Sequence, residues 1–155
     1  MSQETGYAEF VQGLELGSVS LVECSAIRHK GTEFDDAPVE IATGSRLLGS
    51  ELGYRFEVQC RPLDVEGDLV AELKVVFVTS FTSAQELPQD SPYLTQFGTD
   101  VATMAAYPYI REALQGLASR LDLRNFTLGL LHRSDVALEP EPEAEGTSEA
   151  ASQAG

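Results

Sequence analysis

The chain has 155 residues, enough for one domain with a hydrophobic core, and 43% of them are hydrophobic. Its 25 acidic and 10 basic residues give a formal net charge of −15. Phosphates repel such an acidic surface, so nucleic acid is disfavoured as a partner. No signal peptide is visible and no apolar run is long enough to cross a bilayer, so we expect a soluble, cytoplasmic protein without membrane insertion.

After a loose start over residues 1–10, the first half of the chain is predicted to form strands. The first strand runs over about residues 14–27, and its alternation slips near Gly17, which suggests a bulge. The second strand covers residues 39–47, where polar and apolar residues alternate as in a half-buried strand.

Two further strands complete the predicted sheet. Residues 54–60 alternate most cleanly, and Pro62, which has no backbone donor, ends this strand. Residues 69–81 follow after a turn and complete a hairpin. The order indicates a four-stranded antiparallel meander.

The last predicted strand is apolar on both faces, because Val70, Val76 and Val78 face away from its other apolar residues. A half-buried antiparallel strand should alternate cleanly, so both faces are expected to be covered. A helix can cover one face, and a second copy of the sheet would cover the other. Val70, Val76 and Val78 are then an oligomer interface. The alternative is a strand that is fully buried inside one chain.

The second half is predicted to hold a long connection, one main helix and a tail. Residues 83–96 form the connection, and such loops are often functional. The helix begins near Thr99 or Asp100 and keeps one apolar face, with a kink or restart at Pro108. Residues 122–131 fit either a short strand or a helical turn.

These elements define an α+β fold, a four-stranded antiparallel sheet followed by one main α-helix. Residues 1–138 make up the domain. Residues 139–155 have too little apolar surface to fold and are expected to form an acidic, disordered tail.

The sequence holds no recognisable catalytic or nucleotide-binding motif. His29 and His132 are single and far apart, and Cys24 and Cys60 are expected to be buried free thiols. Asp64, Glu66 and Asp68 alternate in a turn and could bind calcium, but too few ligands accompany them, so a solvated turn is favoured. We therefore expect no enzyme, no cofactor and no metal.

Binding is the remaining kind of function. Tyr93, Leu94, Phe97, Tyr107 and Tyr109 cluster around the connection and the start of the helix. Aromatic side chains beside a loop make good apolar contact sites. The alternative is ordinary core packing, which should claim at least half of them.

The sequence of the predicted helix resembles that of a known protein family. Tyr107-Pro108-Tyr109-Ile110-Arg111-Glu112 resembles the aromatic-Pro-Tyr-Ala-Arg-Glu segment of the SecB family of export chaperones. Gly116-Leu117-Ala118-Ser119-Arg120 resembles the continuation of that segment. Four strands, a crossover connection and an acidic tail also occur in the order of the family. Thr79–Ser83 replaces the glycine-rich turn of the family, and its second long helix is not evident after Asn125.

The resemblance implies an ATP-independent holdase that binds unfolded client proteins. It also implies a homotetramer, a dimer of dimers whose sheets pack face to face. The client-binding residues that it implies are Phe77, Val78, Phe81, Tyr93, Leu94, Phe97, Tyr109, Phe126, Leu128 and Leu130.

Members of the family dock on the SecA motor through an acidic sheet surface and the tail, which here correspond to Glu57, Glu72, Glu139, Glu141, Glu143 and Glu145. Other SecB-like proteins protect the antitoxin of a toxin–antitoxin pair, and the shortened C-terminal half fits that branch equally well. The alternatives to a chaperone are an oligomeric adaptor with one dedicated protein partner and an enzyme with an unrecognised site.

Overall fold

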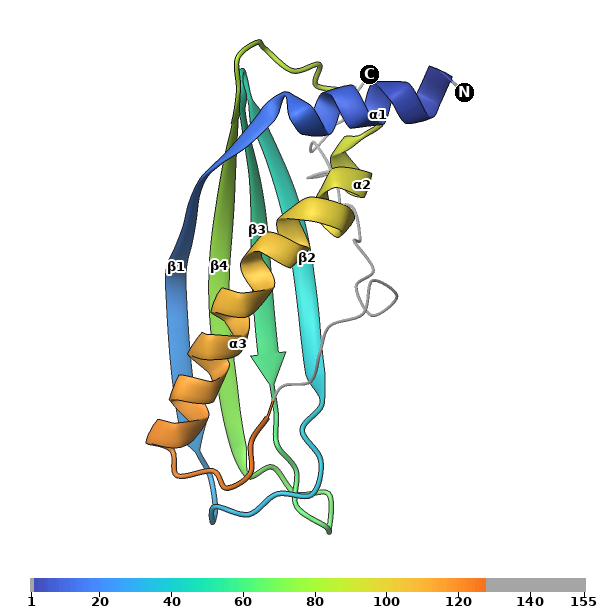
Figure 1. Ribbon diagram of the computed structural model, residues 1–155. Helices are drawn as coiled ribbons and strands as arrows, with labels where there is room; N and C mark the ends of the chain where they lie inside the picture. The colour runs from blue at the N-terminus through green and yellow to red at the C-terminus, as the bar shows by residue number, and fades with distance from the viewer. Residues whose placement is uncertain (1, 128–155) are drawn as a thin grey trace, which may run out of the picture.

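The computed structural model describes residues 2–127, with side chains from residue 6 onward. Four strands form one antiparallel sheet, and the main helix lies diagonally across one of its faces (Figure 1). The predicted α+β fold, with a four-stranded sheet followed by one main helix, is confirmed. The predicted boundary between domain and tail, at residues 138 and 139, lies outside the described residues.

The strands are ordered β1-β4-β3-β2, and the predicted meander is therefore wrong. Their bounds are β1 Leu14–Arg28, β2 Val39–Leu48, β3 Glu51–Cys60 and β4 Ala71–Ser83. A tight turn joins β2 to β3, and residues 61–70 join β3 to its neighbour β4, whereas residues 29–38 carry the chain from β1 to the opposite edge of the sheet. This arrangement is a Greek key. Local alternation cannot distinguish it from a meander, because both place the same residues on the same faces.

Strand β1 contains two irregularities, one between Leu16 and Ser18, as predicted near Gly17, and a second between Leu21 and Glu23. In a regular strand, residues three apart point to opposite faces. The second bulge inserts Val22, so Leu21 and Cys24 share the face of the sheet that carries the helix. The residues directly opposite them on β4, Phe77 and Val75, belong to the core on that face.

The helical half begins earlier than predicted. A short helix, α2 (Leu94–Phe97), leads through a π-helical turn, η1 (Gly98–Ala102), into the main helix, α3 (Thr103–Arg120). Helix α3 continues through Pro108 without a break. The chain then turns at Asp122 and Asn125, both with positive φ, and the described part of 122–131 forms neither a strand nor a helix.

The expected loose start is wrong, because residues Ser2–Gln12 form a helix, α1. Its side chains Tyr7, Phe10 and Val11 lie three or four residues apart and pack against the core. This contact depends on residues some 80 positions away in the chain, so the composition of the segment did not reveal it.

The core lies between α3 and the inner face of the sheet. Strand β3 supplies its centre with Leu52, Tyr54, Phe56, Val58 and Cys60, each at most 1% exposed. The clean alternation of this strand is confirmed. Cys60 is buried as predicted, but Cys24, which lies on the edge strand β1, is exposed.

Candidate functional site

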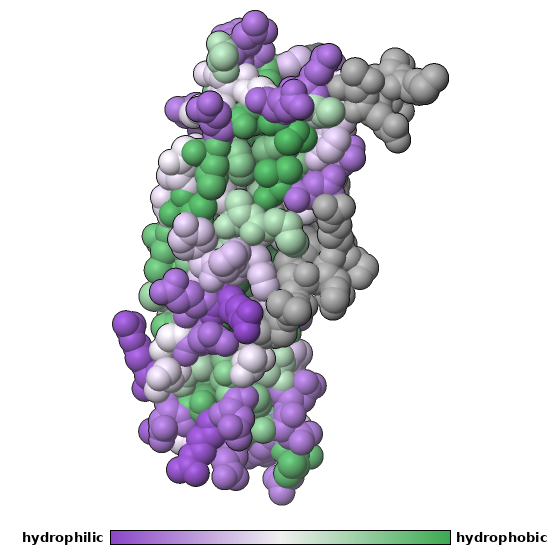
Figure 2. All heavy atoms as spheres, viewed as in Figure 1, coloured by the Kyte–Doolittle hydropathy of each residue, from purple (hydrophilic) through white to green (hydrophobic). Residues whose placement is uncertain are grey.

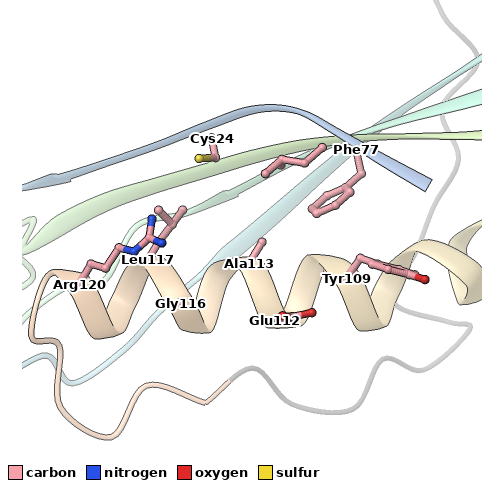
Figure 3. Close-up of a pocket in the computed structure, with 9 residues that line it drawn as sticks. Cys24, Phe77, Tyr109, Glu112, Ala113, Gly116, Leu117 and Arg120 are labelled. Atoms are coloured by element: carbon pink, nitrogen blue, oxygen red, sulfur yellow. The ribbon is translucent and has the colours of Figure 1, made fainter. Parts of the chain in front are cut away.

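An apolar groove opens between α3 and the β1–β4 side of the sheet (Figure 3). Its volume is about 360 Å³, at the lower end of the range of small-ligand pockets. Its lining residues are Leu21, Cys24, Phe77, Tyr109, Glu112, Ala113, Gly116, Leu117 and Arg120.

The helical wall of the groove follows from the spacing of its residues. Tyr109, Glu112, Ala113, Gly116 and Arg120 recur at three or four positions and therefore share one stripe of α3. Beside it runs the buried stripe that anchors α3 to the sheet. The small side chains of Ala113 and Gly116 leave the space between helix and strand open. A methyl group added at Gly116 would meet nothing within 4 Å.

Strands β1 and β4 form the floor. Leu21 and Phe77 are direct cross-strand partners, and the ring of Phe77 lies 6.5 Å from that of Tyr109, measured between centroids. Leu21 is half exposed although it points to the helix side. Figure 2 shows apolar colour along the margin where β1 runs, whereas the middle of α3 presents hydrophilic side chains. The groove thus offers an accessible apolar surface with charged groups, Glu112 and Arg120, on its helical wall.

The structure separates the predicted client-binding residues into different environments. Phe77 and Tyr109 line the groove. Phe81 and Phe97 are at most 2% exposed and belong to the core. For Phe97 this is the outcome that the packing alternative predicted. Val78 is half-buried on the opposite face of the sheet, beside Arg55 of β3.

The remaining predicted client-binding residues lie away from the groove. Tyr93 and Leu94 are half-buried at the other end of the sheet, where α1 packs. The ring of Phe126 stands 6.0 Å from that of Phe34. Leu128 and Leu130 lie outside the described residues.

Sequence reasoning missed most of the groove. Leu21 and Cys24 share a face only because of the second bulge, which leaves no clear signal in the sequence. Gly116 carried a usable signal, because a glycine inside a helix costs about 1 kcal/mol relative to alanine and is retained where space is needed.

The two described members of the predicted acidic docking surface, Glu57 and Glu72, are paired with basic side chains of this chain. On the outer face, Glu57 accepts a hydrogen bond of 2.9 Å from Arg55 and lies 3.3 Å from Lys74 Nζ. Hydrogen bonds from Arg55, Gln59 and Lys74 lower the pKa of the Glu57 carboxyl. Glu72 lies 2.9 Å from His29 and 3.6 Å from Arg61. Glu139, Glu141, Glu143 and Glu145 lie outside the described residues.

The three valines predicted as an oligomer interface do not share one exposed face. Val70 belongs to the core cluster, so its assignment to the outer face is wrong. Val76 is 0% exposed yet stands apart from that cluster. Its cross-strand partners, Glu23 and Glu57, both pair with Lys74. We infer that the aliphatic stems of these long side chains cover Val76. Only Val78 retains exposed surface, so the apolar pattern of β4 needs no second sheet to account for Val76.

Two of the alternating acids in the connection between β3 and β4, Asp64 and Asp68, form ion pairs with Lys30. Lys30 Nζ lies 2.6 Å from Asp64 and 2.9 Å from Asp68, and the oxygens of Asp64, Glu66 and Asp68 lie within 4.8 Å of one another. The Lys30 ammonium lowers the pKa of Asp64 and already supplies the positive charge that this cluster attracts. No other metal-ligand cluster occurs among the residues that the structure describes.

The chain thus combines a four-stranded antiparallel sheet, one main helix and an accessible apolar groove beside an edge strand. A similar solved structure is the SecB-like chaperone of Mycobacterium tuberculosis in complex with a ChAD peptide from an antitoxin. The TM-score is 0.66 and the identity 24%, over 84% of this chain and 96% of that chain. The fold is thus that of a SecB-like chaperone.

No protein-family model matches the chain, and no curated protein matches it in sequence. Within residues 2–127, no helix combines the length and apolar character needed to span a membrane.

Proposed function

We propose that this protein is an ATP-independent chaperone that holds non-native polypeptides, with the groove between α3 and the β1–β4 edge as a client-binding site. The observation that carries this proposal is the groove itself, an open apolar cavity of about 360 Å³ in a SecB-like fold. Burying one large apolar side chain there would contribute roughly 1.5–3 kcal/mol before the cost of ordering the client. Such contacts require no particular sequence.

Protection of a labile partner such as an antitoxin is favoured over docking to the SecA motor. The SecB-like chaperone of similar fold was solved with an antitoxin peptide. Glu57 and Glu72, the two described acids proposed to face SecA, are each paired with cations of this chain. Those ion pairs reduce the electrostatic attraction toward a basic partner. The proposal assigns no catalysis and no cofactor to the chain, and places it in the cytoplasm as a homotetramer.

The test is suppression of aggregation of several unrelated unfolded proteins, without ATP. The wild-type protein should suppress aggregation of all of them. Gly116→Phe should lose most of this activity, because Gly116 lines the groove and a side chain that begins there meets no atom within 4 Å of its Cβ, so the ring can occupy the groove. Ser119→Phe adds the same side chain at an exposed position outside the groove and should behave as wild type.

Three outcomes distinguish the hypotheses. Absence of suppression by the wild-type protein would contradict a general holdase. Protection of one partner only would favour the dedicated adaptor. Full activity of Gly116→Phe would show that clients bind elsewhere.

A further inference from the structure

A second aromatic surface lies at the end of the sheet where β1 begins, and α1 occupies it. The ring of Tyr93 lies 5.7 Å from that of Tyr7 and 5.5 Å from that of Phe10, and Phe10 meets Phe97 edge-on at 5.7 Å. We call Tyr93 and Phe97 the aromatic seat. Neither residue lines the groove, so the two surfaces are distinct.

The Phe97 side of the aromatic seat packs against buried aromatic residues of the sheet. Phe97 packs edge-on against Phe81 at 4.8 Å, and Tyr54 lies 6.0 Å from Phe97. All three of these residues are at most 2% exposed. Removal of α1 would therefore leave an ordered aromatic surface.

Helix α1 is itself a weak helix. It has 11 residues, below the length at which isolated helices are stable in water, and contains Gly6. Tyr7, Phe10 and Val11 remain only half-buried in the folded chain. The Tyr7 hydroxyl donates a hydrogen bond of 3.1 Å to Asp100 at the margin. Segments held by few buried groups open at low free-energy cost.

We propose that α1 acts as an internal substitute for a client, occupying the aromatic seat until an amphipathic helical segment with aromatic side chains at positions i and i+3 displaces it. The seat already binds that pattern, because Tyr7 and Phe10 are three residues apart and both touch Tyr93. The displacement of α1 by a client rests on the proposed function, whereas the release of α1 itself can be measured without any client.

A substitution at Gly6 should detach α1 from the aromatic seat without changing the seat itself. A methyl group at Gly6 would collide with the Tyr93 hydroxyl oxygen, while the ring carbon that bears this oxygen lies 3.3 Å away. Gly6→Ala should therefore force α1 and the Tyr93 ring apart and loosen the packing of α1, even though alanine favours helix. Tyr93→Phe removes this oxygen, so α1 should pack on the aromatic seat again in the double variant Gly6→Ala/Tyr93→Phe.

The first experiment measures hydrogen exchange of the amides of residues 7–12. Exchange should be faster in Gly6→Ala than in wild type and should slow again in Gly6→Ala/Tyr93→Phe. Equal exchange in wild type and Gly6→Ala would overturn the proposal, as would a failure of Tyr93→Phe to reverse the change.

The second experiment titrates a fluorescent peptide, SQETGYAEFVQ, which is the sequence of α1 itself. If α1 covers the seat in about 90% of wild-type molecules, Gly6→Ala should bind the peptide about tenfold more tightly. The same peptide with Tyr7→Ala and Phe10→Ala is the control and should not bind. Equal affinities of wild type and Gly6→Ala for the native peptide would overturn the proposal.

Competition then separates this proposal from the proposed function. Saturating peptide should weaken the binding of an unfolded client to Gly6→Ala. If the client binds but the peptide does not compete, the holdase stands and the seat is not a client site. If the wild type binds no client by any assay, the proposed function fails, whatever the exchange data show.

Discussion

The hydroxyl of Tyr54, on β3, donates a hydrogen bond of 2.6 Å to the backbone carbonyl oxygen of Leu94, the first residue of α2. This bond fastens the end of the crossover connection to the centre of the sheet. Leu94 opens α2, which leads through η1 into α3, so the bond ties the start of the helical half to β3.

We predict that Tyr54→Phe lowers the free energy of unfolding by about 1–2 kcal/mol, because a poorly hydrated carbonyl loses its donor. Urea denaturation at pH 7 measures the change. Tyr109→Phe, which alters an exposed ring, is the control and should change little. Equal stability of Tyr54→Phe and wild type would contradict a structural role for the bond.

Alkaline pH should weaken the same contact. Burial raises the pKa of Tyr54 above its usual range. A raised pKa in the folded state means that the contribution to stability is complete below about pH 10, the unfolded pKa, and declines above it. Stability measured from pH 9 to 11 should fall less in Tyr54→Phe than in wild type.

The two cysteines should differ sharply in reactivity. Cys24 is exposed, whereas burial raises the pKa of Cys60 to about 11. At pH 8, iodoacetamide should modify Cys24 alone in the native protein and both cysteines in urea, as mass spectrometry would show. Cys24→Ser should leave the native protein unlabelled. Labelling of Cys60 at the rate seen in urea would contradict its burial.

Two glycines should respond oppositely to alanine. Gly116→Ala should stabilise the protein by up to about 1 kcal/mol, because it favours helix and the added methyl has open space. Gly49→Ala should destabilise it by about 1 kcal/mol, because Gly49 turns from β2 into β3 with φ +60°. Thermal unfolding measures both, and an identical sign for the two changes would contradict the backbone assignments.

Light scattering should test the oligomer that the sequence predicts. We expect a mass near four times 16.7 kDa. Val78→Asp should lower this mass if the outer face of the sheet is an interface, because Val78 keeps exposed surface. A monomeric wild-type protein would contradict the prediction.

Val76→Asp tests whether the burial of Val76 contributes to the stability of the single chain rather than to an oligomer interface. This change places a carboxylate at a fully buried position between Glu23 and Glu57, so it should reduce the stability of the fold itself by several kcal/mol. Circular dichroism should show that loss at any protein concentration. A fully stable Val76→Asp protein would show that the stems of the surrounding ion pairs do not cover this position.

The stability contributed by the Lys30–Asp64 ion pair should be lost at low pH. Lys30 lowers the pKa of Asp64, so this contribution is complete above about pH 4, the unfolded pKa, and is lost as pH falls through the depressed folded value. Carboxyl NMR titration of wild type and Lys30→Met measures it. The pKa of Asp64 should rise toward its usual value in the variant, and an unchanged pKa would contradict the assignment.

Several elements followed from local patterns. The alternation of residues 54–60 predicted β3 and its buried face, and the apolar spacing after Asp100 predicted most of α3. The Tyr107–Glu112 segment suggested a SecB-like protein, and the structure has that fold. These features depend on residues within a few positions of each other, and periodicity reports such relations directly.

Features that join distant parts of the chain were mostly missed. The order of the strands, the seat under α1 and the pairing of Glu57 with Lys74 each depend on contacts that no local pattern records. The groove is a further case, because a single inserted residue, Val22, turns Leu21 and Cys24 toward α3.

The sequence by itself therefore determined the kinds of elements, the acidic character and the absence of recognisable catalytic motifs. Only the tertiary structure decided which apolar residues form the core and which remain accessible. Burial results from the simultaneous packing of β3, β4 and α3, and the surface left open beside β1 is where we propose that clients bind.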